Sequence, residues 1–401
     1  MRLSYKAIGK DGKSVTGLVE AKDISEAATY LRTRELTPIT IKKKESRDLL
    51  ERLPFLKKSK SADLVFFTRQ LSSMLTSGLT LIRSLEILKQ QMRGVYLLEV
   101  MEGIITEIEG GSSFSSAIAK YPDMFSPIYV SIIKTAENSG LLDKALLRLA
   151  DNLEKSAKLR SSIKGALMYP VIVVILMIVV VVLMMIFVIP QLSVLYENLN
   201  IPLPLPTQII VGMSKFLLIL WPLVIVFIVG IIALYRRFAK SPSGRLILDD
   251  TALKIPVFGK LIVQTILAEF SRTFGLLVGT GTLVVDALLQ TANSAGNIHY
   301  KNAIIDVSRK VEKGITIGDA MSASPLFPPL LVQLVRIGEQ TGKLDDSLIK
   351  SSEYFESEVD QQVKTLTTAM EPIIMIILGV GVAFLIISVI TPIYSLISSI
   401  Q

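Results

Sequence analysis

Long apolar runs interrupt the mixed polar and hydrophobic pattern of this 401-residue chain at three places. No charged residue occurs in the runs Val171–Ile189, Phe216–Tyr235 and Ile373–Tyr394. Nineteen residues of α-helix rise about 28 Å, roughly the thickness of the hydrocarbon core of a bilayer. A buried core helix is the less favoured interpretation at these lengths. The pattern therefore predicts three transmembrane helices, at 169–189, 216–235 and 372–394.

Basic residues border the first two runs on one side only. They are Lys155, Lys158, Arg160 and Lys164 before the first run, and Arg236, Arg237, Lys240 and Arg245 after the second. No Lys or Arg occurs at 190–214 or after the third run. Cytoplasmic loops carry the excess of Lys and Arg, so we expect 1–168 and 236–371 in the cytoplasm. The loop 190–215 and the C-terminal tail 395–401 are then outside.

The segments 61–168 and 236–371 resemble each other, which indicates an internal repeat. A spacing of 203 residues relates Phe67 to Phe270, Arg69 to Arg272, Gly78 to Gly281, and Gly111 to Gly314. After one lost residue, a spacing of 202 relates Phe125 to Phe327, Glu137 to Glu339, Gly140 to Gly342, Asp143 to Asp345, Pro170 to Pro372, and Pro190 to Pro392. The second apolar run has no counterpart. The chain thus reads as two copies of a cytoplasmic domain with an outgoing helix, joined by one returning helix.

Each cytoplasmic copy is expected to be a small bundle of about six helices, because its apolar residues recur with helical spacing. The repeated glycines are expected to end helices. They are Gly78, Gly111 and Gly140 in the first copy and Gly281, Gly314 and Gly342 in the second. The predicted fold class is therefore a mainly α integral membrane protein with two cytoplasmic bundles.

The first 41 residues differ from the rest of the chain. Short alternating segments near Tyr5, at Val15–Val19 and at Pro38–Ile41 predict strands, and Ile24–Arg32 predicts a helix. We expect a small α+β cytoplasmic module at 1–41. The following segment, 42–60, carries eight basic and three acidic residues and reads as a linker. A solvated tether is favoured there over contact with anionic lipid headgroups.

Composition excludes several kinds of chemistry. Half of the residues are hydrophobic and only 19% are charged, which agrees with an integral membrane protein. The chain has no cysteine and one histidine, His299, so disulfides, cysteine metal sites and multi-histidine metal sites within one chain are excluded. Residues 1–60 have a net charge of +7, out of +8 for the whole chain. The apolar runs contain no ionisable residue, which argues against a pump or an ion-coupled transporter.

Two repeated glutamates next to glycine corners are the main candidate site residues. Turn capping or a buried hydrogen bond is the favoured role of Glu137 and Glu339. Contact with a partner or a cation is the alternative, which Asp143 and Asp345 would join because oxygen ligands suit hard cations. His299 is expected to be a surface residue in a loop.

The segment Gly338–Leu344 contains Gly342-Lys343 and so has some likeness to a phosphate-binding loop. It has three residues between its glycines, however, and no Ser or Thr follows Lys343, as such a loop requires. We expect a helix–turn–helix corner there, and no nucleotide binding. No catalytic residue, cofactor or metal site is expected elsewhere.

The start of each outgoing helix carries a proline. We expect Pro170 and Pro372 in the first turn of a membrane helix, where a missing N–H costs little. Tyr169 would be an interfacial anchor. Glu371, at the same place in the second copy, would favour a helix N-terminus.

Taken together, these motifs resemble a known family. The corners Glu137–Gly140 and Glu339–Gly342 each lead to a Met-x-Pro motif at the start of a membrane helix, Met168-Tyr169-Pro170 and Met370-Glu371-Pro372. The whole chain is similar to the inner-membrane platform proteins of type IV pili and type II secretion systems, the PilC/GspF family. The N-terminal module departs from the family pattern at Glu35, where a glycine is usual.

The resemblance implies a non-enzymatic role in the bacterial inner membrane. Members of this family are thought to oligomerise, to contact a hexameric cytoplasmic assembly ATPase, and to help move pilin or pseudopilin subunits into a growing fibre. Other inner-membrane assembly proteins are implied partners, and nucleic acid is not. A membrane transporter or channel subunit is the alternative, and a membrane-bound enzyme ranks third because no catalytic set is visible.

Overall fold

The structure is a computed structural model that describes residues 2–8, 14–21, 23–33, 36–43, 61–92, 94–188, 190–191, 193–194, 212, 223, 226–227, 229–239, 241–256 and 258–400. Most of the linker 42–60 and of the loop 190–215, and half of the second predicted span, lie outside these residues. Contacts divide the chain into two units, Met1–Lys60 with Arg93–Val100, and Ser61–Met92 with Met101–Gln401.

The N-terminal module is a three-stranded sheet with one helix. Its elements are β1 (Arg2–Ile8), β2 (Ser14–Glu20), α1 (Ile24–Thr33) and β3 (Thr37–Lys43). The strand order is β2-β1-β3 and both pairings are antiparallel, with Tyr5 opposite Gly17 on one side and Ile41 on the other. Ala27 and Leu31, one helical turn apart, form the buried face of α1. The predicted α+β module is confirmed.

Six helices make up the first bundle, as the sequence predicts. They are α2 (Ser61–Thr76), α3 (Leu81–Gln91), α4 (Val95–Glu109), α5 (Phe114–Ala119), α6 (Pro127–Ser139) and α7 (Leu142–Leu183). Side-chain oxygens of Thr80, Ser113 and Ser126 accept hydrogen bonds from backbone N–H groups in the first turns of α3, α5 and α6. These caps satisfy donors that a helix N-terminus otherwise leaves unpaired.

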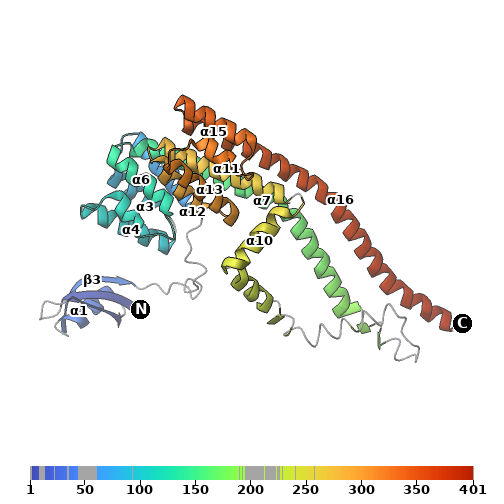
Figure 1. Cartoon of the computed structure of the whole chain (residues 1–401). Helices are drawn as coiled ribbons and strands as arrows, with labels where there is room; N and C mark the ends of the chain where they lie inside the picture. The colour runs from blue at the N-terminus through green and yellow to red at the C-terminus, as the bar shows by residue number, and fades with distance from the viewer. Residues whose placement is uncertain are drawn as a thin grey trace. The chain divides into compact units, whose positions relative to one another are not determined.

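The second bundle repeats this arrangement. Its helices are α11 (Phe258–Gly279), α12 (Val284–Ser294), α13 (Ile298–Glu312), α14 (Ile317–Ser322), α15 (Pro329–Thr341) and α16 (Leu344–Ile400), preceded by α10 (Pro242–Lys254). Figure 1 shows α11, α12, α13 and α15 gathered with the helices of the first bundle.

Equivalent aromatic pairs form the centre of each bundle core. The ring centroids of Phe67 and Phe125 are 5.5 Å apart, and those of their repeat partners Phe270 and Phe327 are 5.7 Å apart. All four side chains are buried. Residues that are equivalent in the repeat therefore make the same contact in both copies, and these ring contacts add to the burial of their apolar area.

The last helix of each bundle continues into the apolar run without a break. α7 has 42 residues and passes directly into a π-helical segment, η2 (Met184–Val188), and α16 has 57 residues. In Figure 1, α16 runs as one helix from the end of α15 to the C-terminal end of the chain. Both helices are long and apolar enough to cross a membrane, and their most apolar stretches are almost entirely unburied.

A third helix of sufficient length and apolarity, α11, has a different setting. Most of its apolar stretch is buried inside the protein, including Phe270 and Phe274. We therefore assign α11 to the bundle core, although composition alone would allow it to span. The described residues of the predicted second span, including 229–235, are helical.

The expected position of the two prolines is wrong. Pro170 lies inside α7 and Pro372 lies inside α16, so neither is in a first turn. A proline inside a helix removes one backbone hydrogen bond and costs about 3 kcal/mol. Glu371 is likewise inside α16 and has no helix N-terminus to stabilise. On the bundle side of the prolines, α7 and α16 pack together through Leu159, Val359, Val363 and Leu366, with Leu261 of α11.

Candidate functional site

The six repeated glycines lie at sharp ends of helices, as predicted. Their φ angles are all positive, between 68° and 89°. At Gly140 (φ 71°) the backbone turns from α6 into α7, and Leu141 N donates to Ala136 O at 2.9 Å. At Gly342 (φ 68°) the same turn joins α15 to α16, with Lys343 N donating to Gly338 O at 2.8 Å. Only glycine adopts this conformation without strain, and the turn sets the direction of each membrane-bound helix.

The two candidate glutamates bind the start of a neighbouring short helix. Glu137 accepts hydrogen bonds from Phe114 N at 2.6 Å and from Ser115 N at 3.0 Å. Glu339 accepts from Ile317 N at 2.9 Å and from Gly318 N at 3.2 Å. A carboxylate is favourable at a helix N-terminus, where N–H groups are unpaired. Each glutamate thus holds α5 or α14 against the helix that ends at the glycine corner, which is the capping role favoured from the sequence.

Asp345, another predicted candidate, lies beside a basic side chain of α7. Asp345 Oδ2 is 3.6 Å from Arg148 Nη1. Among the described residues, no group of three or more His, Asp and Glu side chains has a geometry that could hold a metal ion. The segment Gly338–Leu344 joins α15 to α16 and is a helix–turn–helix corner, as expected. His299 is in the first turn of α13 and is half-buried, so the expectation of a surface loop is wrong.

Three cations of α7 join the first bundle to the second. Arg148 Nη1 donates to Gly279 O at 2.6 Å, at the C-terminal end of α11. Lys155 Nζ is 2.9 Å from Glu353 of α16. Arg160 Nη2 is 3.6 Å from Glu269 of α11. These contacts are exposed, so each adds little stability, about 0–1 kcal/mol, but together they define how α7 lies on the second bundle.

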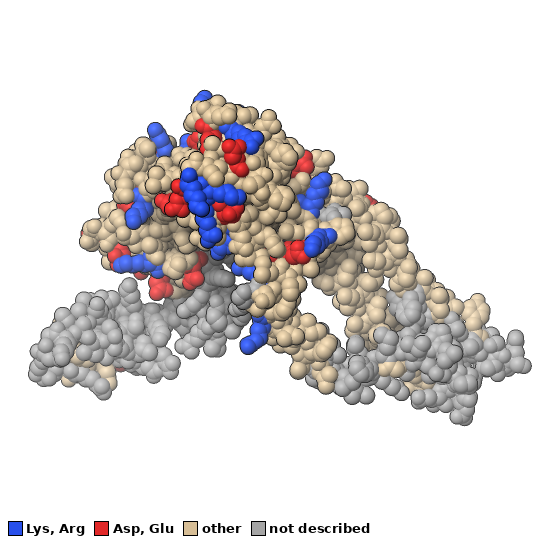
Figure 2. All heavy atoms as spheres, viewed as in Figure 1, with Lys and Arg blue, Asp and Glu red and all other residues tan. Residues whose placement is uncertain are grey.

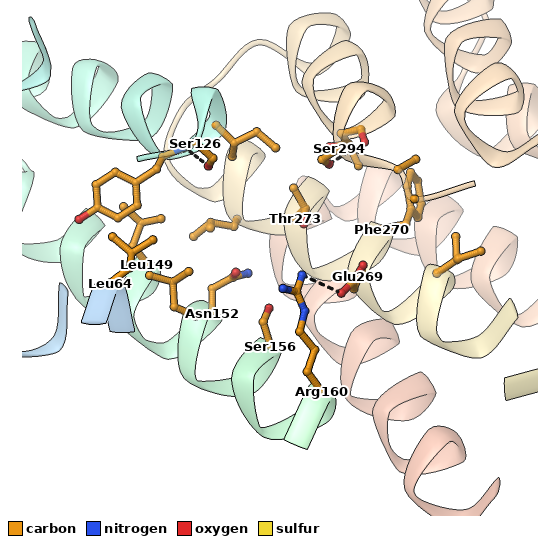
Figure 3. A pocket seen from close by; sticks show the side chains of 18 of the residues that line it. Leu64, Ser126, Leu149, Asn152, Ser156, Arg160, Glu269, Phe270, Thr273 and Ser294 are labelled. Carbon is orange, nitrogen blue, oxygen red and sulfur yellow. Dashed lines mark hydrogen bonds and ion pairs between the residues drawn. The ribbon is translucent and has the colours of Figure 1, made fainter. Parts of the chain in front are cut away.

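A cavity of about 210 Å³ lies between the bundles. Figure 3 shows Asn152 and Ser156 of α7 on one side and Phe270 and Thr273 of α11 on the other, with Arg160 reaching Glu269 at one edge. Asn152 Nδ2 is buried without a hydrogen-bond partner in the structure. Tightly packed interiors contain few such gaps, so the boundary between the bundles is less closely packed than either core.

Sequence reasoning missed one charge pair in each bundle. Arg272 Nη1 donates to Glu356 Oε1 at 2.9 Å, and the Arg272 side chain is only 5% exposed. Burial lowers the pKa of Arg272, and the charges of Glu356 and Glu269 oppose that shift. The available signal was the spacing of 202, which relates Glu356 to Glu154.

The equivalent pair in the first bundle is more exposed. Arg69 Nε donates to Glu154 Oε1 at 2.6 Å, and Arg69 Nη2 is 2.5 Å from Asp151. Hydrogen bonds with Glu154 and Asp151 raise the pKa of Arg69. The same two residue types therefore form an open pair on the first bundle and a covered pair on the second.

The charged side chains of this region position helices. Figure 2 shows Lys and Arg intermingled with Asp and Glu over the bundles. Such a surface presents neither a strongly basic nor a strongly acidic face. The arrangement can transmit a displacement, because each bundle ends in a rigid helix that continues into an apolar segment.

Comparison with known proteins agrees with this architecture. The model of the family described as type II secretion system (T2SS), protein F, matches residues 67–190 and 270–392. The model of the N-terminal domain of that protein matches residues 4–42. The two main matches begin and end at residues that the internal repeat pairs, Phe67 with Phe270 and Pro190 with Pro392.

Full-length relatives are also similar to the chain. A type IV pilus assembly protein PilC of Thermus thermophilus is 36% identical over 99% of this chain and 98% of its own length. A PilC of Myxococcus xanthus is 34% identical over 99% of this chain and 95% of its own length. A type II secretion system protein F of Xanthomonas campestris is 30% identical over 99% of this chain and 98% of its own length.

Proposed function

Since the chain belongs to the type II secretion system protein F family, we propose that it is a platform protein in the inner membrane of a type IV pilus or type II secretion machine. It couples a cytoplasmic assembly ATPase to the insertion of pilin or pseudopilin subunits into a fibre, and it catalyses no reaction itself. The names of the relatives, pilus assembly and type II secretion proteins, support this role. Neither of these names is that of a transporter or channel.

One structural observation carries the proposal. In each repeat the last bundle helix, α7 or α16, continues without a break into an apolar membrane segment. A motor that displaces a bundle therefore displaces a membrane helix, because a continuous helix transmits rotation and translation along its axis. A ligand shifts a conformational equilibrium only through different affinities for its states. Motor docking is thus expected to change the placement of the bundles relative to each other or to the spans.

An insertion in α7 tests this coupling. Two alanines placed after Met168 rotate the span by about 200° relative to its bundle, since each helical residue turns about 100°. Four alanines rotate it by about 40° net and serve as the matched control. We expect the two-alanine variant to insert in the membrane yet to abolish fibre production or secretion, and the four-alanine variant to retain part of it. Normal fibre production by the two-alanine variant would contradict the coupling.

The proposed topology places both bundles in the cytoplasm and the C-terminus outside. The chain has no natural cysteine, so single introduced cysteines report their own side of the membrane. Lys134→Cys, an exposed position on α6, is expected to react with a membrane-impermeant maleimide only after the cells are opened. A cysteine added after Gln401 is expected to react in intact spheroplasts. The reverse result would refute the topology.

A further inference from the structure

The contacts between the two bundles run in one direction. Arg148, Lys155 and Arg160 of the first bundle reach acceptors in the second. At the spacing of 202, their equivalents are Lys350, Ser357 and Gln362. In the described part of the chain, no hydrogen bond or ion pair joins these three to the first bundle. Two different patches therefore meet, and a contact of this heterologous kind leaves one patch of each kind unused.

The unused acceptor patch lies on α2 and α7. We call it the α2–α7 patch and define it by Phe66, Arg69, Asp143, Leu147 and Asp151. Arg69 is 28% exposed, whereas its equivalent Arg272, covered by α7, is 5% exposed.

Two large apolar side chains of this patch are open to solvent. Phe66 is 41% exposed and Leu147 is 43% exposed. Ile349, the equivalent of Leu147, is half-buried and lines the cavity beneath α7. The position of Leu147 is thus open in the first bundle, whereas its equivalent is partly covered in the second.

The unused donor patch is a stripe along α16. It consists of Lys350, Tyr354, Ser357 and Gln361, all of them exposed. They occupy the positions that Arg148, Asn152, Lys155 and Leu159 have on α7 at the spacing of 202. We call this the outer stripe of α16.

We infer that the α2–α7 patch binds the outer stripe of α16 from a second copy of this chain. This contact repeats between molecules the one that α7 makes within a molecule. Lys350 would face Asp143 as Arg148 faces Asp345. The orientation suits a membrane, because α7 and α16 both lead from a bundle into a span, so both copies keep the same polarity. The inference rests on the proposed function in that it needs both bundles on one side of one membrane.

One sequence difference shapes this contact. Gly279, which Arg148 approaches, has Thr76 as its equivalent. A Cβ atom at Gly279 would clash with Arg148 Nη1, the end of a flexible side chain, so the contact seen there would have to shift at Thr76. Lys350 therefore depends on the Asp143 carboxylate, and reversal of either charge is expected to weaken the contact.

Cross-linking between two full-length variants tests the inference. The pair Lys155–Glu353 has Ser357 and Asp151 as its equivalent between copies. Differently tagged Asp151→Cys and Ser357→Cys chains, co-expressed and oxidised in native membranes, are expected to form a mixed disulfide dimer. Lys134→Cys on α6 replaces Asp151→Cys in the control and is expected to give none. Lys350→Asp in the Ser357→Cys chain should lower the yield about fivefold, and Asp143→Lys in the partner chain should restore it.

Several outcomes would overturn the inference. Dimers of either single-cysteine variant expressed alone would indicate a symmetric interface instead. Equal yields from Lys134→Cys and Asp151→Cys, or no mixed dimer at all, would place any self-association elsewhere. If fibres or secretion persist in cells whose chains show no such dimer, this interface is refuted and the proposed function is retained. If the dimer forms but the two-alanine insertion leaves fibres unchanged, the contact between copies is supported and the proposed coupling is refuted.

Discussion

Removing the charge of Glu356 is expected to destabilise the protein far more than removing that of its repeat equivalent, Glu154. Arg272 is buried, its Nη1 has Glu356 as its ion-pair partner, and its Nη2 has no hydrogen-bond partner in the structure. Removing one partner of a buried pair leaves a buried charge uncompensated, at a cost of about 3–5 kcal/mol. Glu269 also attracts this guanidinium, so we expect Glu356→Gln to cost about 3 kcal/mol.

The first bundle supplies the matched control. Arg69 is 28% exposed and keeps Asp151 at 2.5 Å when Glu154 is changed. Exposed ion pairs contribute about 0–1 kcal/mol, so Glu154→Gln is expected to cost less than about 1 kcal/mol. The two substitutions are chemically identical, and only the burial of the arginine differs.

Thermal unfolding of the purified full-length protein in detergent, followed by near-UV circular dichroism, measures both effects. At about 2–4 °C per kcal/mol, Glu356→Gln should lower Tm by about 6–12 °C and Glu154→Gln by less than about 4 °C. Replacing the buried pair together, Arg272→Met with Glu356→Leu, should recover most of the loss because no buried charge remains. Equal losses in the two single variants, or no recovery in the double variant, would refute the reasoning.

Three further predictions concern the corners and one buried tyrosine. Gly140→Val and Gly342→Val should each cost about 1–2 kcal/mol and reduce fibre assembly, because a Cβ there meets no atom within 4 Å and the cost is backbone strain alone; Gly140→Asn should cost less, and unchanged melting of the valine variants would count against strain. Lys343→Ala should leave ATP binding by the purified protein unchanged, because the corner offers no phosphate loop; measurable ATP affinity that this variant loses would reverse that view. Burial raises the pKa of Tyr300 from 10.0 to about 12, so its contribution to stability is present below pH 10 and is lost as pH rises towards about 12. The stability of Tyr300→Phe should therefore fall less steeply between pH 10 and 12 than that of the unmodified protein. Identical dependences of stability on pH would show that Tyr300 does not contribute to this loss.

The sequence was most informative where the physics is local or repeated. Glycine at Gly140 and Gly342 predicted helix ends because few other residues adopt positive φ without strain. Long-range pairing of Phe67 with Phe270 and of Phe125 with Phe327 predicted two like bundles. The role of Glu137 was left open between capping and a partner contact, because the N–H groups that it binds belong to another helix. That the predicted site residues contact partner proteins remains a prediction.

Pro170 and Pro372 show where local reasoning failed. A proline predicts a helix start because its lost hydrogen bond is free of cost only there. In the folded protein, both prolines lie within long helices that pack together two to three turns earlier, through Val363 and Leu366 of α16 and Leu159 of α7. Apolar packing stabilises helices more than local propensity does, and it offsets the missing bond.

The sequence alone determined the membrane character, the duplication and the helical class. The length of the apolar runs and their basic flanks are local properties of the chain, and the repeat is found by comparing residues at a fixed spacing. The placement of one bundle on the other was decided only by tertiary structure. Arg69 and Arg272 occupy equivalent positions and have equivalent glutamate partners, yet only Arg272 is covered by α7. The burial of one arginine and not the other depends on how the two bundles pack together, which involves contacts between residues far apart in the chain.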